Sequence, residues 1–124
     1  MNKQDLKDRT KKLAVDTINF LNTLPKSKSN DVISYQLIKS VTSIGANYRS
    51  SLRGRSSAEF ISKLNIVLEE ADESMFWFEL LNETNMEVNH LKIKSLHEES
   101  NELTAIFAAS LKTARNNLNL KSKI

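Results

Sequence analysis

The chain has 124 residues, no cysteine, two glycines, one proline and a formal net charge of +3 at pH 7. This composition excludes disulfides, thiol catalysis and cysteine-ligated metals, and so few helix-breaking residues favour a few long helices in one domain covering residues 1–124. The sequence has no segment with the apolar core of a secretory signal and no run of about 18 apolar residues, so we expect a soluble, cytoplasmic protein without a membrane segment.

The spacing of apolar residues predicts an all-α fold with four amphipathic helices, arranged as an antiparallel up-down-up-down four-helix bundle. The first helix should run from about Lys3 to Leu24, because Pro25 cannot continue it. The second should follow a cap at Ser29 or Asn30 and end near Leu52.

The third and fourth helices are predicted from their own start signals. Ser56 and Glu59 have the S-x-x-E spacing of a capping box, so the third helix should begin there and end near Glu83. The fourth should begin within residues 89–92, and we expect the tail, residues 119–124, to fray.

Two glycines fall in or beside the second helix. Gly45 lies inside it, where glycine costs about 1 kcal/mol relative to alanine, and we expect a neighbouring helix to approach closely there. A hinge is the alternative. Gly54 lies in the following turn, where we expect the left-handed conformation that commonly ends a helix.

Charge is divided along the sequence. Basic residues dominate from Lys26 to Lys63, whereas every charged residue from Leu64 to His90, the histidine aside, is acidic. Adjacent regions of opposite charge are typical of surfaces that bind a partner or another copy of the same chain.

The third predicted helix has apolar residues on a second face, roughly opposite its core-facing line. A tryptophan framed by acids is typical of a subunit contact, since aromatic residues carry much of the binding energy at interfaces. The alternative is that the helical phase drifts and Trp77 packs at an edge of the bundle. The predicted oligomer-interface residues are Ile66, Glu69, Glu70, Glu73, Trp77 and Leu80.

The connection between the second and third helices is basic. Arg49 and Arg53 are four residues apart and therefore share a helix face. Arginine offers a fork of donors that matches phosphate oxygens. These residues could instead pair with carboxylates, from Glu59 or from another subunit. The predicted nucleic-acid-binding residues are Arg49, Arg53, Arg55 and Lys63.

The start of the first helix is also basic. We interpret this segment as a solvated face, with nucleic-acid contact as the alternative. It comprises Lys3, Lys7, Arg9, Lys11 and Lys12.

No catalytic motif is present, so we expect no enzymatic activity and no cofactor. Glu87 and His90 have the Glu-x-x-His spacing of di-iron bundles, but they fall in a predicted connection, and the residue three before His97 is a lysine. We therefore expect no metal, and we assign both histidines to solvent exposure or local hydrogen bonds.

Two short motifs lie on the second and third predicted helices: T-S-I-G-A-N at Thr42–Asn47 and E-F-I-x-K-L at Glu59–Leu64. With these motifs the chain resembles the bacterial four-helix-bundle proteins first noticed as reading frames inside intervening sequences of 23S ribosomal RNA genes. It is similar to the branch that has Y-R after the first motif, here Tyr48 and Arg49. The turn of that branch often has a cysteine and an alanine where this chain has serine and Gly54.

The resemblance implies an antiparallel four-helix bundle assembled as a homopentameric ring or barrel. It also implies kinship with the accessory variability proteins of diversity-generating retroelements, which are similar pentamers that engage a reverse transcriptase and nucleic acid. The general family has no established catalytic activity.

The residues and the resemblance together predict a non-enzymatic, homo-oligomeric and pentameric scaffold. Its basic surface would face RNA, DNA or a nucleic-acid-processing protein such as a reverse transcriptase. The alternative is a protein-interaction module without nucleic-acid affinity, whose arginines form intersubunit ion pairs.

Overall fold

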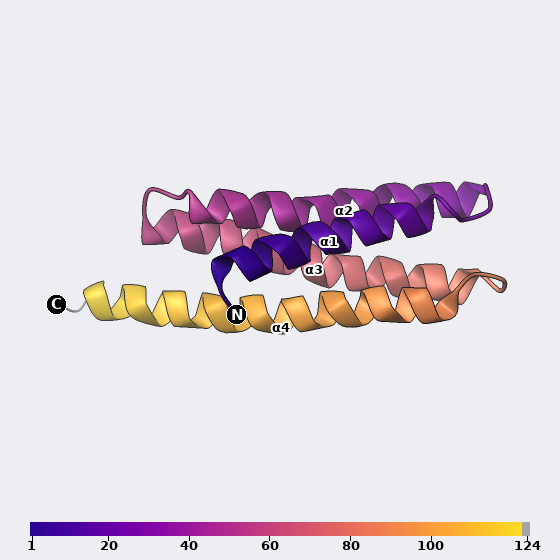
Figure 1. Ribbon diagram of the computed structural model, residues 1–124. Helices are drawn as coiled ribbons and strands as arrows, with labels where there is room; N and C mark the ends of the chain where they lie inside the picture. The colour runs from indigo at the N-terminus through magenta and orange to yellow at the C-terminus, as the bar shows by residue number, and fades with distance from the viewer. Residues whose placement is uncertain (123–124) are drawn as a thin grey trace.

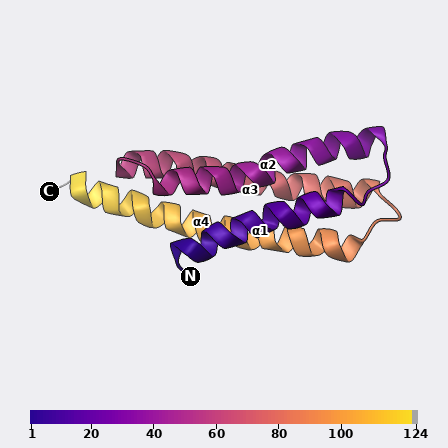
Figure 2. The ribbon, with the colours of Figure 1, turned by 45° about the horizontal axis from the view of Figure 1, so that its top comes forward.

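The computed structural model describes residues 1–122, which form four helices and no strand: α1 (Lys3–Leu21), α2 (Lys28–Leu52), α3 (Ser57–Thr84) and α4 (His90–Ser122). This confirms the predicted all-α class and the number of helices. The α1–α2 and α3–α4 connections lie at one end of the molecule and the α2–α3 turn lies at the other, so successive helices run in opposite directions (Figures 1 and 2). In this part of the chain, no helix is apolar enough over a sufficient length to cross a lipid bilayer.

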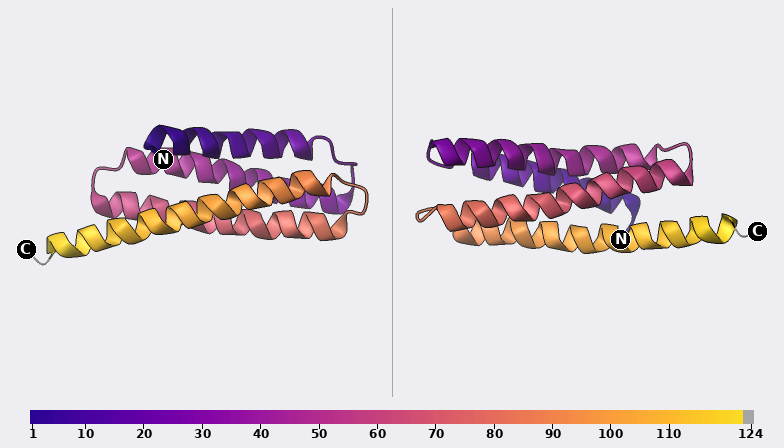
Figure 3. Two further views of the ribbon diagram at one scale, coloured as in Figure 1. Left: turned by 60° about the horizontal axis from the view of Figure 1, so that its bottom comes forward. Right: turned by 180° about the vertical axis from the view of Figure 1, so that it is seen from behind.

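We call the end that contains the α2–α3 turn the turn end. The last turns of α4 reach past this turn and project from the body of the molecule (Figure 3). The opposite end, with the other two connections, is the connection end.

The caps explain where the first two helices begin and end. Asn2 and Asp5 form a capping box at α1, and α1 ends at Leu21 rather than at Leu24. The N-cap of α2 is Ser27, whose hydroxyl accepts a hydrogen bond from the Asn30 backbone N–H at 3.1 Å. The predicted caps at Ser29 and Asn30 were therefore wrong, because α2 begins at Lys28 and both residues lie inside its first turn.

The third and fourth helices begin close to their predicted starts. Ser56 accepts a hydrogen bond from the Glu59 backbone N–H at 3.1 Å, as a capping box requires. The Glu59 carboxylate, however, accepts from the Arg55 backbone N–H rather than from that of Ser56, so only half of the predicted box forms. Asn89 caps α4 by accepting from the Lys92 backbone N–H at 3.0 Å. The helix continues to Ser122, so residues 119–122 are helical rather than frayed; 123–124 lie outside the described residues.

Gly54 does not have the positive φ that was predicted for it. The need for glycine is steric. A Cβ at this position would lie 3.2 Å from the Ser51 carbonyl oxygen and 3.3 Å from both Glu59 Cβ and Phe60 N. The turn passes so close to the first turn of α3 that no side chain fits without a shift.

Gly45 meets the expectation of a close neighbour, which is α1. A Cβ at Gly45 would lie 3.6 Å from Thr10 Oγ1 and 3.8 Å from Thr10 Cβ, which are ordinary van der Waals distances. The approach therefore leaves room for one methyl group. Alanine forms helix better than glycine, and a methyl group would fit here. Packing within the subunit therefore does not offset the loss of helix stability that Gly45 causes.

We expect Gly45→Ala to stabilise the isolated subunit by up to about 1 kcal/mol, since a better helix former fits without a clash. Urea unfolding followed by circular dichroism measures the change. Gly54→Ala is the matched control and should lower stability. A loss of stability in Gly45→Ala would contradict the packing described for Thr10.

The core runs along the whole bundle. Its centre is filled by side chains that are fully buried: Leu37, Val41, Ile44, Leu64, Val67, Phe78, Leu103 and Phe107. The rings of Tyr48 and Phe107 lie 5.2 Å apart across the core, between α2 and α4. A hydrogen bond of 2.8 Å from Ser74 to Ser40 joins α3 to α2. These contacts fix the hairpin of α2 and α3 on which the basic turn is carried.

Candidate nucleic-acid interface

Three of the four predicted basic residues come together at the turn end. Arg49 of α2, Arg53 at the C-cap of α2 and Lys63 of α3 line an open groove of about 420 Å³. Arg55 lies in the turn, exposed and outside the lining of the groove. The groove exists because α2 and α3 are adjacent and the turn between them is short.

These four side chains have no internal partner. Within residues 1–122, Arg49, Arg53, Arg55 and Lys63 form no side-chain hydrogen bond and no ion pair. Glu59 also lines the groove, but its carboxylate accepts from a backbone N–H of the turn. Pairing of the arginines with Glu59 of the same hairpin, one of the two alternatives drawn from the sequence, is therefore not seen.

The last part of α4 adds basic residues that sequence reasoning missed. Lys112, Arg115 and Lys121 are exposed, and they lie on the half of α4 that reaches the turn end (Figure 1). Arg115 donates to Asn65 Oδ1 at 3.0 Å, which ties this half of α4 to α3. These basic residues could have been found from the sequence, because it contains no acidic residue after Glu102.

The basic segment of α1 is only partly a solvated face. Arg9 reaches α4, where it donates to both oxygens of Glu99, at 2.5 and 3.0 Å, and lies 3.3 Å from Glu102. Lys12 pairs with Asp16 one turn along at 2.9 Å. Arg9 therefore holds α1 to α4, and it is not available to an outside partner.

The predicted interface stripe on α3 lies nearer to the core than expected. Ile66, Trp77 and Leu80 are half-buried. Trp77 and Leu80 pack against the core and, with Val32 of α2, line a groove between α2 and α3. This is the edge position given above as the alternative. With about 3.6 residues per turn, neighbours are about 100° apart, so Trp77 beside buried Phe78 and Ile66 beside buried Val67 flank the core-facing line rather than lie opposite it.

The exposed aromatic residue of α3 is Phe76, which is not among the predicted interface residues. Its exposed fraction is 54 %, and its ring packs edge-on against Trp77 with centroids 5.0 Å apart. Trp77 in turn donates its indole N–H to Glu73 Oε1 at 3.1 Å. The acidic neighbours Glu69 and Glu73 are exposed, as predicted for an outward-facing surface.

The acids of α3 repel one another. Burial raises the pKa of Glu70, and the nearby carboxylates of Glu73 and Glu69 raise it further, while Lys39 of α2 lowers it in part. The folded-state pKa of Glu70 therefore lies above the ordinary value of 4.5. Ionised Glu70 destabilises the fold, so stability is lost as the pH rises from 4.5 through the raised pKa.

We expect Glu70→Gln to raise the melting temperature relative to the wild type at pH 7 and to have little effect below pH 4.5, where Glu70 is protonated. Thermal unfolding at a series of pH values measures this. The same change at exposed Asp72, Asp72→Asn, is the control. An equal effect of Glu70→Gln at all pH values would contradict the assigned cause.

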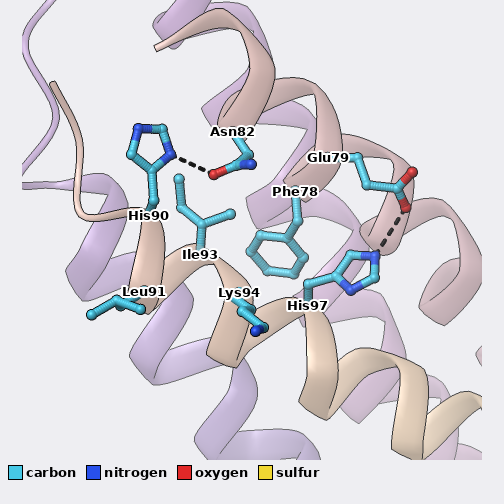
Figure 4. Close-up of a pocket in the computed structure, with 8 residues that line it drawn as sticks. All are labelled: Phe78, Glu79, Asn82, His90, Leu91, Ile93, Lys94 and His97. Atoms are coloured by element: carbon cyan, nitrogen blue, oxygen red, sulfur yellow. Dashed lines mark hydrogen bonds and ion pairs between the residues drawn. The ribbon is translucent and has the colours of Figure 1, made fainter. Parts of the chain in front are cut away.

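A cavity of about 340 Å³ lies at the connection end, between α3 and α4 (Figure 4). Its polar residues are already paired: His97 Nε2 lies 2.9 Å from Glu79 Oε2, and His90 Nδ1 lies 2.5 Å from Asn82 Oδ1. Both histidines thus make hydrogen bonds to α3 and join it to α4. In the described residues, no three His, Asp or Glu side chains are grouped so that they could hold a metal ion.

Comparisons with known proteins agree with this fold. The family described as 23S rRNA-intervening sequence protein matches residues 2–109. A crystal structure of a protein of unknown function from the S23 ribosomal protein family of Bacteroides thetaiotaomicron has 35% sequence identity and a TM-score of 0.81. That match covers 90% of this chain and 99% of the other. No curated protein matches the sequence.

Proposed function

The chain belongs to the 23S rRNA-intervening sequence protein family, and from this premise and the geometry of the turn end we propose that it is a non-enzymatic, homo-oligomeric scaffold that binds nucleic acid. We propose a pentamer in the cytoplasm, in line with the resemblance described above. The bound nucleic acid, or a nucleic-acid-processing protein such as a reverse transcriptase, would lie against the basic turn end.

The observation that carries this proposal is the set of unpaired cations at the turn end. Arg49, Arg53 and Lys63 line a groove in which Glu59 is the only acid, and Arg55 lies in the adjoining turn. Unpaired arginines that are close together suit the closely spaced negative charges of a phosphate backbone. Tyr48 is 4 % exposed and packs on Phe107, so it is not available for base stacking. The surface therefore favours contacts to phosphates over contacts to bases.

Two features support self-assembly. Phe76 leaves a large apolar surface exposed on α3, and of the exposed acids around it only Glu73 and Glu79 have a partner in residues 1–122. Repetition of the turn end around an oligomer would strengthen a modest basic patch by avidity.

A second candidate function is a protein-interaction module without nucleic-acid affinity, whose arginines pair with acids of another subunit. It is favoured by the position of Arg49, which lines a second groove, between α1 and α2, as well as the groove at the turn. Under this function Arg53 and Arg55 would also be needed for assembly.

Binding of labelled structured RNA, single-stranded DNA and duplex DNA over a salt series tests the proposal. We expect binding to all three that weakens steeply as salt rises, because phosphate contacts release counterions. If the protein binds none of the three nucleic acids at about 0.15 M salt, the second candidate function is favoured.

A further inference from the structure

The outer face of α3 forms an acidic ridge. Phe76 is its one large apolar residue, and the acids precede it by three, four and seven residues or follow it by seven, which places them on the same side of the helix. All are exposed. The acidic ridge consists of Glu69, Asp72, Glu73, Phe76 and Glu83.

Glu79, three residues after Phe76 on the same side of α3, pairs with His97 of α4 and is not counted in the ridge. The negative charge of the ridge itself is not balanced within the subunit. In the part of the chain that the structure describes, Glu69, Asp72 and Glu83 form no ion pair, and Glu73 accepts only from the Trp77 indole. Ridge carboxylates also raise the pKa of Glu70 beside them. A cationic surface would therefore relieve repulsion as well as cover Phe76.

The ridge cannot be its own partner. A two-fold contact through the ridge would place these acids against copies of themselves, which is unfavourable. Because the surface that covers the ridge must be basic, a second copy would have to offer a different face. Such a head-to-tail contact builds a ring when its rotation closes.

The groove between α1 and α2 has the complementary character. It has a volume of about 330 Å³, which is enough for an aromatic side chain. Its floor is made of small residues, since Gly45 has no side chain over Thr10 and Ala14 and Ala46 flank it.

The rim of this groove is basic. Lys11 of α1 and Arg49 of α2 line it, and neither side chain has an ion pair within residues 1–122. The groove contains no acidic residue. The groove, with an apolar floor between two cations, is therefore complementary to the acidic ridge, with an aromatic residue between carboxylates.

We propose that the acidic ridge of one subunit docks into the α1–α2 groove of the next copy of this chain, with Phe76 against the small residues and the ridge carboxylates facing Lys11 and Arg49. This inference rests on the proposed homo-oligomer and identifies its two contacting faces. It assigns Arg49 to assembly and leaves Arg53, Arg55 and Lys63 to nucleic acid.

The test uses one variant of each face. The groove variant is Lys11→Glu with Ala46→Glu, and the ridge variant is Phe76→Glu; all three positions are exposed, so the fold should be kept. Circular dichroism checks the helix content of each. The control is Lys94→Glu with Ala109→Glu, the same changes at exposed positions of α4 away from both faces.

Light scattering then gives the mass of each protein alone and of an equimolar mixture. We expect an oligomer for the wild type and the control, and a monomer for each variant alone. The mixture should form a 1:1 dimer and nothing larger, because it contains one intact ridge and one intact groove that can meet.

If the wild type is an oligomer and the groove variant keeps its mass, this contact is wrong while the oligomeric scaffold stands. A mixture of folded variants that remains monomeric also overturns the contact. A wild-type monomer overturns both the contact and the oligomeric scaffold.

Discussion

Replacing Arg53, Arg55 and Lys63 together by alanine should lower the affinity for nucleic acid on the order of 100-fold at low salt, since each phosphate contact is worth roughly 1 kcal/mol or more. The slope of log affinity against log salt should also fall by about 2 to 3, because each lost contact removes nearly one released counterion. Fluorescence anisotropy with labelled RNA and DNA over a salt series measures both.

The control for this variant is the replacement of Lys26, Lys28 and Lys94 by alanine. These exposed residues lie at the connection end, and their loss changes the net charge by the same amount. The control should bind almost as well as the wild type. Equal losses in both variants would show that only net charge matters. Dissociation of the variant at Arg53, Arg55 and Lys63 into monomers would favour pairing of these residues with acids of another subunit.

Phe107→Ala should destabilise the subunit by about 3–5 kcal/mol, a large part of the stability of a domain of this size. Phe107 is fully buried, and its ring lies 5.2 Å from that of Tyr48 across the core. The substitution leaves a cavity between α2 and α4 that their helix packing cannot close. Chemical denaturation of the purified protein measures the loss.

Leu120→Ala on the same helix is the control for Phe107→Ala. Leu120 is 62 % exposed, so its truncation should change stability by less than about 0.5 kcal/mol. A cost of under 1 kcal/mol for Phe107→Ala would show that the core near the basic turn is not packed as described.

The fold was predictable because its signals are local. The spacing of Leu37, Val41 and Ile44 is that of a helix that buries one face, and the breaks at Pro25 and Gly54 separate the elements. The details that were missed depend on competition between neighbours. Ser27 caps α2 in place of the predicted residues, and Gly54 is needed because the first turn of α3 lies too close for a Cβ, a distance that no sequence pattern gives.

The basic turn was predictable from spacing, whereas its lack of internal pairing was not. Whether Glu59 bonds an arginine side chain or a backbone N–H depends on the geometry of one turn. Trp77 is next to buried Phe78 and so flanks the core-facing line, whereas Phe76 lies on the outer side of α3. Trp77 as an oligomer-interface residue stays a prediction. The family resemblance is confirmed; the kinship with retroelement proteins stays a prediction.

The central claim is that an oligomer of this chain binds nucleic acid through its turn end. Sedimentation of the wild-type protein with a labelled structured RNA at about 0.15 M salt tests both parts at once, because the label reports binding and the sedimentation coefficient reports mass. We predict that the RNA sediments with an oligomer of several subunits. If the sedimentation coefficient of the RNA is the same with and without the protein, whatever the mass of the protein, the claim is contradicted.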